Sequence, residues 1–446
     1  PDACLFPHVA PRMGDLHHDP GSKESLALIN GWIDNCGHSH QRCMMPQQVR
    51  IPKRLLQCLP NGFVRLVETH SLPQPCGYIA LSYCWGDDKE AVPKTNEATL
   101  DRHQRGIPVK DLPRLFQEVF ALACGVDIAY LWIDSLCIIQ DSDKDKDEEL
   151  MKMSDIFRGA FVVFVAASAR SPSESLLRVK PQSDQSHIWS APSVIRYQEM
   201  DIEVRFRKRA LRAHFLPDTT LDTPTGGRAW CYQEKLLATR CLVFCDDEVV
   251  WECRSGCQCE CGLAFNEKNV KQALPMRQYA QKLLPLAKHE PLQLDGTLKY
   301  FADAEAAYSF WQDAVRDYSR GALSFKTDRL PAISAAASIV AEATQDRYLA
   351  GLWRKDLLAG LSWVASWEAG MKGLKNAPRP HQDYIAPTWS WASLPRGVFY
   401  PRGFHSCRSR DTRDARLGAS VDIAWTNLEG QNKYGRVSDA AIVLSG

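Results

Sequence analysis

The strongest constraint on the fold is an alternation of short apolar segments and amphipathic segments between residues 78 and 170. Tyr78–Cys84 is apolar and runs into Trp85-Gly86, which is typical of a buried strand that ends in a turn. Ile128–Ile133 is too short for a helix and rich in β-branched and aromatic residues, and Phe161–Ala167 is a third apolar run. We predict that these segments are neighbouring parallel strands.

The segments between these strands have helical patterns. Leu112-Pro113 opens a helix whose apolar positions fall on one face and which ends at Gly125. Asp143–Phe157 is charged, with apolar residues at helical spacing near its end. Strands that alternate with helices indicate an α/β fold, in which a parallel sheet is covered on both faces.

Polar residues at the ends of the first two strands are the first candidates for a site, because ligands of parallel sheets bind beyond the carboxyl ends of the strands. The candidates at these ends are Ser82, Trp85, Gly86, Asp134, Ser135 and Cys137. The alternative is that Asp134 caps a turn and Trp85 fills the core.

A second group of candidates lies in the sequence RAWCYQEKLLATRCLVF at 228–244, where polar residues interrupt an apolar run. They are Arg228, Trp230, Gln233, Glu234 and Arg240. One interpretation is a buried arginine–glutamate pair that orients the two halves of the chain, since buried charge is retained when it is paired. The other is that these groups face the same cleft as the strand ends.

A cysteine and histidine cluster lies near the N-terminus, where Cys36, His40 and Cys43 have the short spacing of zinc ligands and His38 is within reach. Three ligands leave a tetrahedral site incomplete. Cys253, Cys257, Cys259 and Cys261 follow within a short segment of the second half. We predict a zinc completed by one of these, with Cys259 the first choice; the alternative is that all are unliganded.

Composition bounds the remaining possibilities. The 54 Lys and Arg residues against 53 Asp and Glu give a net charge of +1, which does not favour a general nucleic-acid or membrane-surface binder. No apolar run is long enough to span a membrane. Many of the 16 cysteines lie inside apolar stretches, as small reduced hydrophobes do, so we expect a cytoplasmic protein.

The rest of the chain divides around the central segment. We predict an N-terminal segment over 1–77, with a hairpin formed by Gln48–Ile51 and Phe63–Glu68, then an α/β domain over 78–175. A mixed α+β, β-rich C-terminal half follows over 190–446. Its predicted elements are strands at Ser193–Lys208, 241–245, 249–253, 441–444 and around Trp389 and Trp391, and helices at 302–318 and 332–343.

Several ordered blocks resemble the heterokaryon incompatibility (HET) domain proteins of filamentous fungi. They are LSYCWG at 81–86, LP at 112–113, LWIDSLCIIQD at 131–141, the RAWCYQE block, DRLPAIS at 328–334 and APTWSWAS at 386–393. The family also has a Cys-x-x-x-His-x-x-Cys segment, which Cys36, His40 and Cys43 resemble in this chain. The resemblance implies a TIR-like, flavodoxin-like sheet and a role in fungal non-self recognition and cell death.

A TIR-like fold further implies attack on a dinucleotide such as NAD. In that scheme a carboxylate on the helix after the second strand handles the ribose, with Glu149 the first choice and Asp134 the second. The alternative for Glu149 is an ordinary solvated helix start.

Two other functions stay open at this point. Sequence motifs of nucleoside triphosphatases, dinucleotide-binding folds, zincins and serine hydrolases are absent. Some family members lie beside biosynthetic enzymes, so one alternative is an enzyme of secondary metabolism that performs acid–base chemistry on an apolar molecule, with Asp134, Glu234 or Cys137 as proton carrier or nucleophile. The other is a non-catalytic adaptor. The partner is accordingly a small molecule or a protein, and a homo-oligomer stays open.

Overall fold

One mixed sheet organises the described part of the computed structural model, with ten strands in the order β12-β11-β10-β9-β6-β3-β5-β1-β2-β4. The structure describes residues 19–44, 51–72, 76–177, 193–197, 200–204, 223–246, 248–260, 264–266, 304–366, 383–395, 397–401, 420–430 and 432–445.

Four parallel strands form the centre of the sheet. They are β5 (Tyr130–Trp132), β3 (Ile79–Ser82), β6 (Val162–Val165) and β9 (Arg240–Phe244). Ile79 lies opposite both Leu131 and Val162, so β3 pairs in parallel with β5 and β6. The three predicted strands and their parallel pairing are confirmed, and the fold class is α/β overall. We did not predict that β9 continues the same sheet beside β6.

Antiparallel strands extend both ends of this centre. On one side are β1 (Arg54–Leu59), β2 (Phe63–Glu68) and β4 (Ile107–Pro108); on the other are β10 (Val249–Cys253), β11 (Gly256–Cys259) and β12 (Ala264–Asn266). The predicted N-terminal hairpin exists, and Gly62 has the positive φ of 76° that its turn needs. The strand that pairs with Phe63–Glu68 is 54–59, because Arg54 through Leu59 are in register with Glu68 through Phe63. Of the predicted segment Gln48–Ile51, all but Ile51 lies outside the described residues.

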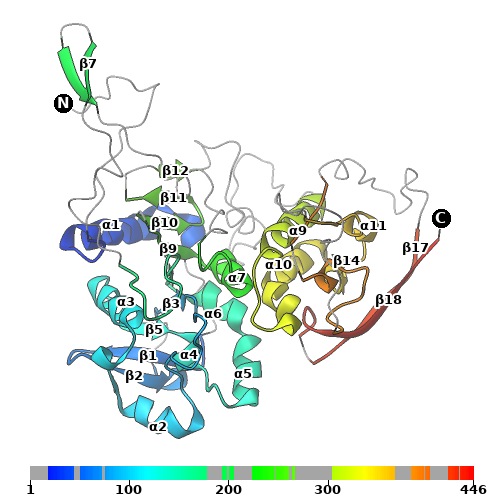
Figure 1. Ribbon diagram of the computed structural model, residues 1–446, viewed down its shortest axis with the longest axis horizontal. Coiled ribbons are helices and arrows are strands. Elements are labelled where there is room, and N and C mark those ends of the chain that lie inside the picture. The colour runs from blue at the N-terminus through cyan, green and yellow to red at the C-terminus, as the bar shows by residue number, and fades with distance from the viewer. Residues whose placement is uncertain are drawn as a thin grey trace.

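Helices cover both faces of the sheet (Figure 1). Helices α1 (Lys23–Ser39) and α3 (Arg114–Gly125) lie on one face, and α5 (Asp143–Leu150), α6 (Met153–Gly159) and α7 (Ala229–Leu237) on the other. The shorter helices nearby are α2 (Glu97–Arg105) and α4 (Asp134–Cys137), with 3-10 turns η1 (Gln41–Cys43), η2 (Thr69–Ser71) and η3 (Val109–Asp111). Within the described residues, no helix combines the length and apolar content that crossing a membrane requires.

The single helix predicted over 143–157 is wrong in one respect, because the chain turns between α5 and α6. Asp145 anchors α5 to the sheet by an ion pair with Arg54 and by accepting a 2.9 Å hydrogen bond from Ile139 N. The buried residues of α6 are instead apolar, among them Met153, Ile156 and Phe157. The two segments therefore present different faces to the protein, which one straight helix cannot do.

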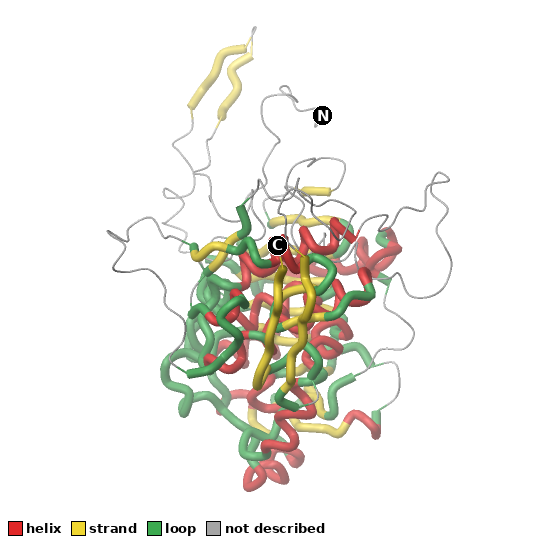
Figure 2. The backbone as a smooth tube through the Cα atoms, turned by 90° about the vertical axis from the view of Figure 1, so that its right-hand side faces the viewer, coloured by secondary structure: helices red, strands yellow, loops and turns green. Residues whose placement is uncertain are grey.

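The C-terminal part packs against α7. Its main elements are α9 (Ala304–Tyr318), α10 (Ser334–Thr344) and a hairpin of β17 (Ser420–Leu428) and β18 (Val437–Ser445), which lies across its outer side (Figure 2). The predicted apolar face of α9 is confirmed, since Phe310, Trp311 and Tyr318 are buried. The shorter elements are η6 (Lys326–Arg329), η7 (Pro331–Ile333), β13 (Tyr348–Leu349), β14 (Leu352–Trp353), α11 (Leu357–Gly360), β15 (Val364–Ala365), η9 (Trp391–Ser393) and β16 (Val398–Phe399).

The predicted strand around Trp389 and Trp391 is wrong, because Trp391 begins the 3-10 turn η9. Ser390 Oγ donates a 2.5 Å hydrogen bond to Ala350 O and accepts one of 3.1 Å from Ala392 N. These local hydrogen bonds compete with a strand conformation. The expectation that the tryptophans belong to the core holds for Trp391, which is fully buried.

Some predicted elements lie partly outside the described residues. The predicted strand at Ser193–Lys208 is a hairpin of β7 (Ser193–Tyr197) and β8 (Met200–Val204) as far as it is described. Cys261 and the first two residues of the helix predicted at 302–318 lie outside the described residues.

Gly321 provides a test of how closely the C-terminal part packs on α7. A Cβ at this position would lie 2.8 Å from both N and Cα of Ala229, and backbone atoms have little freedom to move away. We expect Gly321→Ala to lower the free energy of unfolding by about 1–3 kcal/mol, measured by chemical denaturation.

The matched control is Gly31→Ala in α1, where a Cβ would have no neighbour within 4 Å. Alanine is the better helix former, so this variant should be as stable as the wild type or more stable. Equal stability of the two variants would contradict the close approach.

Candidate functional site

A polar cluster lies beyond the carboxyl ends of β3 and β5, and Asp134 is its most exposed carboxylate. Asp134 follows β5 directly and begins α4. Its Oδ2 accepts a 2.9 Å hydrogen bond from Trp85 Nε1, and its Oδ1 accepts one of 2.7 Å from Ser135 N. Burial raises the pKa of Asp134, while the positive charge of Arg228 and these hydrogen bonds act in the opposite direction.

Arg228 reaches the cluster from the start of α7. Its Nη1 donates a 2.5 Å hydrogen bond to Tyr83 O, just beyond β3. Burial disfavours its charge, but the acidic groups Cys231, Glu234, Cys84 and Asp134 together raise the pKa of Arg228. The backbone at this point is fixed by a 3.0 Å hydrogen bond from Ala229 N to Ala322 O. The guanidinium is therefore held over the strand ends as a permanent positive charge.

Glu234 is the innermost carboxylate of the cluster. It lies on α7 three residues after Cys231, so these two side chains share one face, and the charge of Arg228 at the N-cap acts on both. Burial raises the pKa of Glu234 to about 7, opposed by the neighbouring Ser82 hydroxyl and by Arg228. An acid with this pKa can both give and take a proton near neutral pH.

Two atoms inside the cluster lack hydrogen-bond partners. Ser82 Oγ and Glu234 Oε2 are both buried, and neither has a partner of acceptable geometry. Ser82 nevertheless lies close enough to Glu234 to favour its charged form. Buried polar atoms are rarely left unsatisfied, so this pair is a place where a ligand hydroxyl or water would gain two hydrogen bonds.

The structure brings together Ser82, Trp85, Asp134, Arg228 and Glu234 from the two groups of sequence candidates. The buried arginine–glutamate pair is not formed as a direct contact: among the described residues, Arg228 makes its hydrogen bond to a backbone carbonyl. Tyr83 and Cys231 also belong to the cluster and were missed. Tyr83 donates a 3.1 Å hydrogen bond to Ser135 Oγ. The spacing of Cys231 from Arg228 was the available signal.

Three other candidates point into packed regions. Cys137 is buried and its Sγ lies 3.9 Å from Leu131 O. Trp230 Nε1 donates to Asp328 Oδ2 at 3.3 Å. Gln233 Oε1 accepts a 2.9 Å hydrogen bond from Ala335 N and so caps the start of α10.

Glu149 and Gly86 have their contacts with residues outside the polar cluster. Glu149 is completely buried, and its Oε1 pairs with Lys152 Nζ at 3.2 Å. Gly86 has φ of 80°, and a Cβ there would lie 2.8 Å from the Cβ of Ser171, so this glycine allows the turn after β3 to approach the segment after β6.

A groove of about 500 Å³ lies elsewhere, between α6, α10 and the segment before β18. Arg158, Ser338, Glu342 and Lys433 are among its lining residues, and none of the residues predicted from the sequence lines it. We favour the polar cluster as the functional site, because it combines an unpartnered hydroxyl, two carboxylates and a guanidinium.

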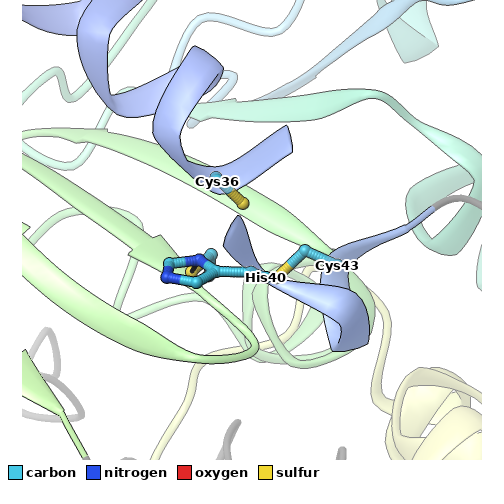
Figure 3. A group of neighbouring side chains, drawn as sticks. Cys36, His40 and Cys43 are labelled. Carbon is cyan, nitrogen blue, oxygen red and sulfur yellow. Dashed lines mark hydrogen bonds between the residues drawn. The ribbon is translucent and has the colours of Figure 1, made fainter. Parts of the chain in front are cut away.

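A second site has the side chains to hold a metal ion. One ligand atom each from Cys36, His40, Cys43 and Cys253 lies within 4.8 Å of all the others. Cys36 is in the last turn of α1, His40 follows the helix, and Cys43 ends η1; Figure 3 shows these three side chains converging. Cys253 Sγ lies 3.4 Å from His40 Nδ1.

The predicted fourth ligand, Cys259, is corrected to Cys253. In the β10–β11 hairpin Cys253 lies at the turn, opposite Gly256, whereas Cys259 lies opposite Val250 and is farther along the sheet. Cys259 is also part of a disulfide. His38 is excluded as a close ligand, because it is exposed and its Nδ1 lies 2.7 Å from Asp34 O on its own helix.

A match to a known family covers both segments that form the polar cluster, the strand ends and the start of α7. Residues 78–234 match the family model "Heterokaryon incompatibility protein (HET)", a range that begins directly before β3 and ends at Glu234. The Neurospora crassa protein "Heterokaryon incompatibility protein 6, OR allele" is 23% identical over 218 residues, covering 43% of this chain and 32% of that protein. The match thus spans about a third of the relative's length. No solved structure matches.

The raised pKa of Glu234 predicts a stability difference that depends on pH. The ordinary value is 4.5, and in the folded protein it is about 7. In the unfolded protein this carboxyl therefore ionises at lower pH than in the folded protein. The free energy of unfolding consequently falls as the pH rises from 4.5 to 7. Glu234→Gln avoids this loss, so its stability relative to wild type should increase over that range, by at most about 3 kcal/mol.

Denaturation at a series of pH values measures this difference. Glu342→Gln, at an exposed position of α10, is the control and should show no such trend. A Glu234→Gln difference that stays constant between pH 4.5 and 7 would contradict the raised pKa.

Proposed function

This chain is a HET domain protein, and we propose that it acts in fungal non-self recognition and cell death by cleaving NAD at the polar cluster. The name of the Neurospora crassa relative supports the biological role. The observation that carries the chemical proposal is the buried pair of unpartnered atoms, Ser82 Oγ and Glu234 Oε2, beside a guanidinium and a second carboxylate.

The order of the parallel strands supports a TIR-like or flavodoxin-like core. The first parallel strand, β3, lies between the second and third, β5 and β6, and the fourth, β9, follows β6. This is the order of a doubly wound sheet, whose ligands bind beyond the carboxyl ends of its strands. The polar cluster occupies that edge.

Each group in the cluster has a role in hydrolysis of the nicotinamide–ribose bond. Arg228 binds the diphosphate of NAD, for which a guanidinium is well suited. Asp134 stabilises the positive charge that develops on the ribose as the C–N bond breaks and nicotinamide leaves with the electron pair. Glu234 takes a proton from the water that adds to the ribose carbon, and Ser82 donates a hydrogen bond to a ribose hydroxyl.

Nicotinamide release by the purified full chain tests this proposal. We expect Asp134→Asn and Glu234→Gln to lower the rate at least about 100-fold, because each removes a group that acts on the reacting atoms. Glu149→Gln is the matched control: Glu149 is a buried carboxylate that faces Lys152 and not the cluster, so its loss should leave the rate unchanged.

The same assay separates the alternatives. A wild-type protein that leaves NAD intact but converts a member of a panel of fungal aromatic metabolites would replace the NAD proposal with the secondary-metabolic enzyme. A protein that converts neither would favour the adaptor. Loss of nicotinamide release in Glu149→Gln alone would move the catalytic carboxylate to that helix.

We further propose that the metal of the Cys36, His40, Cys43 and Cys253 cluster is zinc and that it is structural. Three thiolates and one imidazole are a donor set typical of closed structural zinc sites. Cys253 pairs with Arg240, the first residue of β9, so the cluster lies at the amino edge of the parallel strands, opposite the polar cluster. Zinc there would join His40 to Cys253, which are 213 residues apart in sequence.

Elemental analysis tests the zinc. We expect about one equivalent in the wild type, and chelation should lower the melting temperature by at least about 5 °C, since the site joins two distant segments. Cys253→Ser should lose the metal. Cys257→Ser, a buried cysteine of the adjacent strand outside the cluster, should keep it. Zinc far below one equivalent, with a melting temperature indifferent to chelators, would contradict this proposal.

A cytoplasmic location fits both proposals. Twelve cysteines of the described part of the chain are outside disulfides, with Cys259 the exception. NAD is a cytoplasmic metabolite, and thiolate ligands need a reducing compartment to stay available.

A further inference from the structure

Arg240 contacts both N-terminal cysteines of the metal cluster, Cys36 and Cys43. It is the first residue of β9 and is only 3% exposed. Its Nε donates a 3.3 Å hydrogen bond to Cys36 Sγ, and its Nη2 donates one of 2.7 Å to Cys43 O. The third nitrogen, Nη1, donates to Phe161 O at 3.3 Å, and the guanidinium lies 4.9 Å from the centre of the Phe161 ring.

The charges of the cluster do not balance without this arginine. Three thiolates around a divalent cation leave a net charge of −1, and Cys36, Cys43 and Cys253 are all buried. An uncompensated charge in such a place is costly. Arg240 supplies the one missing positive charge and delivers it by a hydrogen bond to a ligand sulfur.

We infer that Arg240 is a positioning residue of the metal centre, which neutralises the Cys36 thiolate and fixes the two cysteine-bearing segments around the ion. Groups that hydrogen-bond to metal ligands orient them and tune their affinity for the metal. This inference rests on the proposal that the cluster holds zinc.

The shape of the side chain matters as well as its charge. A guanidinium has donors in a fixed plane, so one side chain can contact the Cys36 sulfur and the Cys43 carbonyl at the same time. The ammonium of a lysine is a single point charge and cannot reproduce this arrangement. Lysine should therefore restore the charge balance without restoring the orientation.

The test compares metal binding by the full chain with arginine, lysine or methionine at 240. Zinc affinity is measured by competition with a chromogenic chelator, and the cobalt form is examined by its sulfur-to-metal charge-transfer absorption. We expect Arg240→Met to bind zinc about 10–100-fold more weakly and to shift the cobalt band, because the Cys36 thiolate loses its hydrogen bond. Arg240→Lys should lose less affinity but show a similar band shift.

Arg254→Met is the matched control. Arg254 follows Cys253 directly, and its Nη1 donates to Arg42 O at 3.3 Å. It contacts the Cys43 thiol through its backbone N–H, which methionine keeps. Its loss should leave affinity and spectrum unchanged. If Arg240→Met does not fold, Arg240→Gln takes its place with the same expected weakening and band shift.

The outcomes separate this inference from the zinc proposal. A wild type that binds neither zinc nor cobalt would overturn both. A wild type that binds zinc tightly, together with Arg240 variants of equal affinity and identical cobalt spectra, would overturn the role of Arg240 alone. An equal weakening in Arg254→Met would also overturn it, since any nearby cation would then suffice.

Discussion

The parallel pairing of β3 with both β5 and β6 is the constraint on which the rest of the structure depends. Ile79 is in register with Leu131 on one side and Val162 on the other, and all four residues of β3 are buried. A strand enclosed on both sides and both faces must be apolar along its length. Polar side chains that could contact a ligand therefore occur only where this strand ends, at Ser82 and the residues that follow.

Helix α7 and strand β9 connect the two sites of the molecule. The helix carries Arg228 and Glu234 to the carboxyl edge of the sheet, and the strand that follows begins with Arg240 at the amino edge. A change in the register of this single segment would displace the guanidinium at one end and the sulfur contact at the other. The segment is also held by the C-terminal part, through Gln233 and the backbone of Ala322.

The two edges of the sheet have different physical characters. At the carboxyl edge, burial raises the pKa of Glu234 and leaves polar atoms without partners, a costly arrangement that is typical of functional sites. At the amino edge, the side chains of Cys36, His40, Cys43 and Cys253 converge and Arg240 contacts Cys36, so residues far apart in the sequence lie close together. This division resembles that of other parallel α/β proteins, where chemistry gathers at one edge.

The sequence alone determined the three central strands, the helix from Arg114 to Gly125, the apolar face of α9 and three of the four residues of the Cys/His cluster, because each depends on periodicity or short spacing. Tertiary structure alone decided three further features. It placed β9 beside β6, chose Cys253 at a hairpin turn over Cys259, and buried Glu149 while it brought Glu234 to Ser82. These depend on contacts between residues far apart in the chain, and local patterns contain no information about which distant partner a side chain will meet.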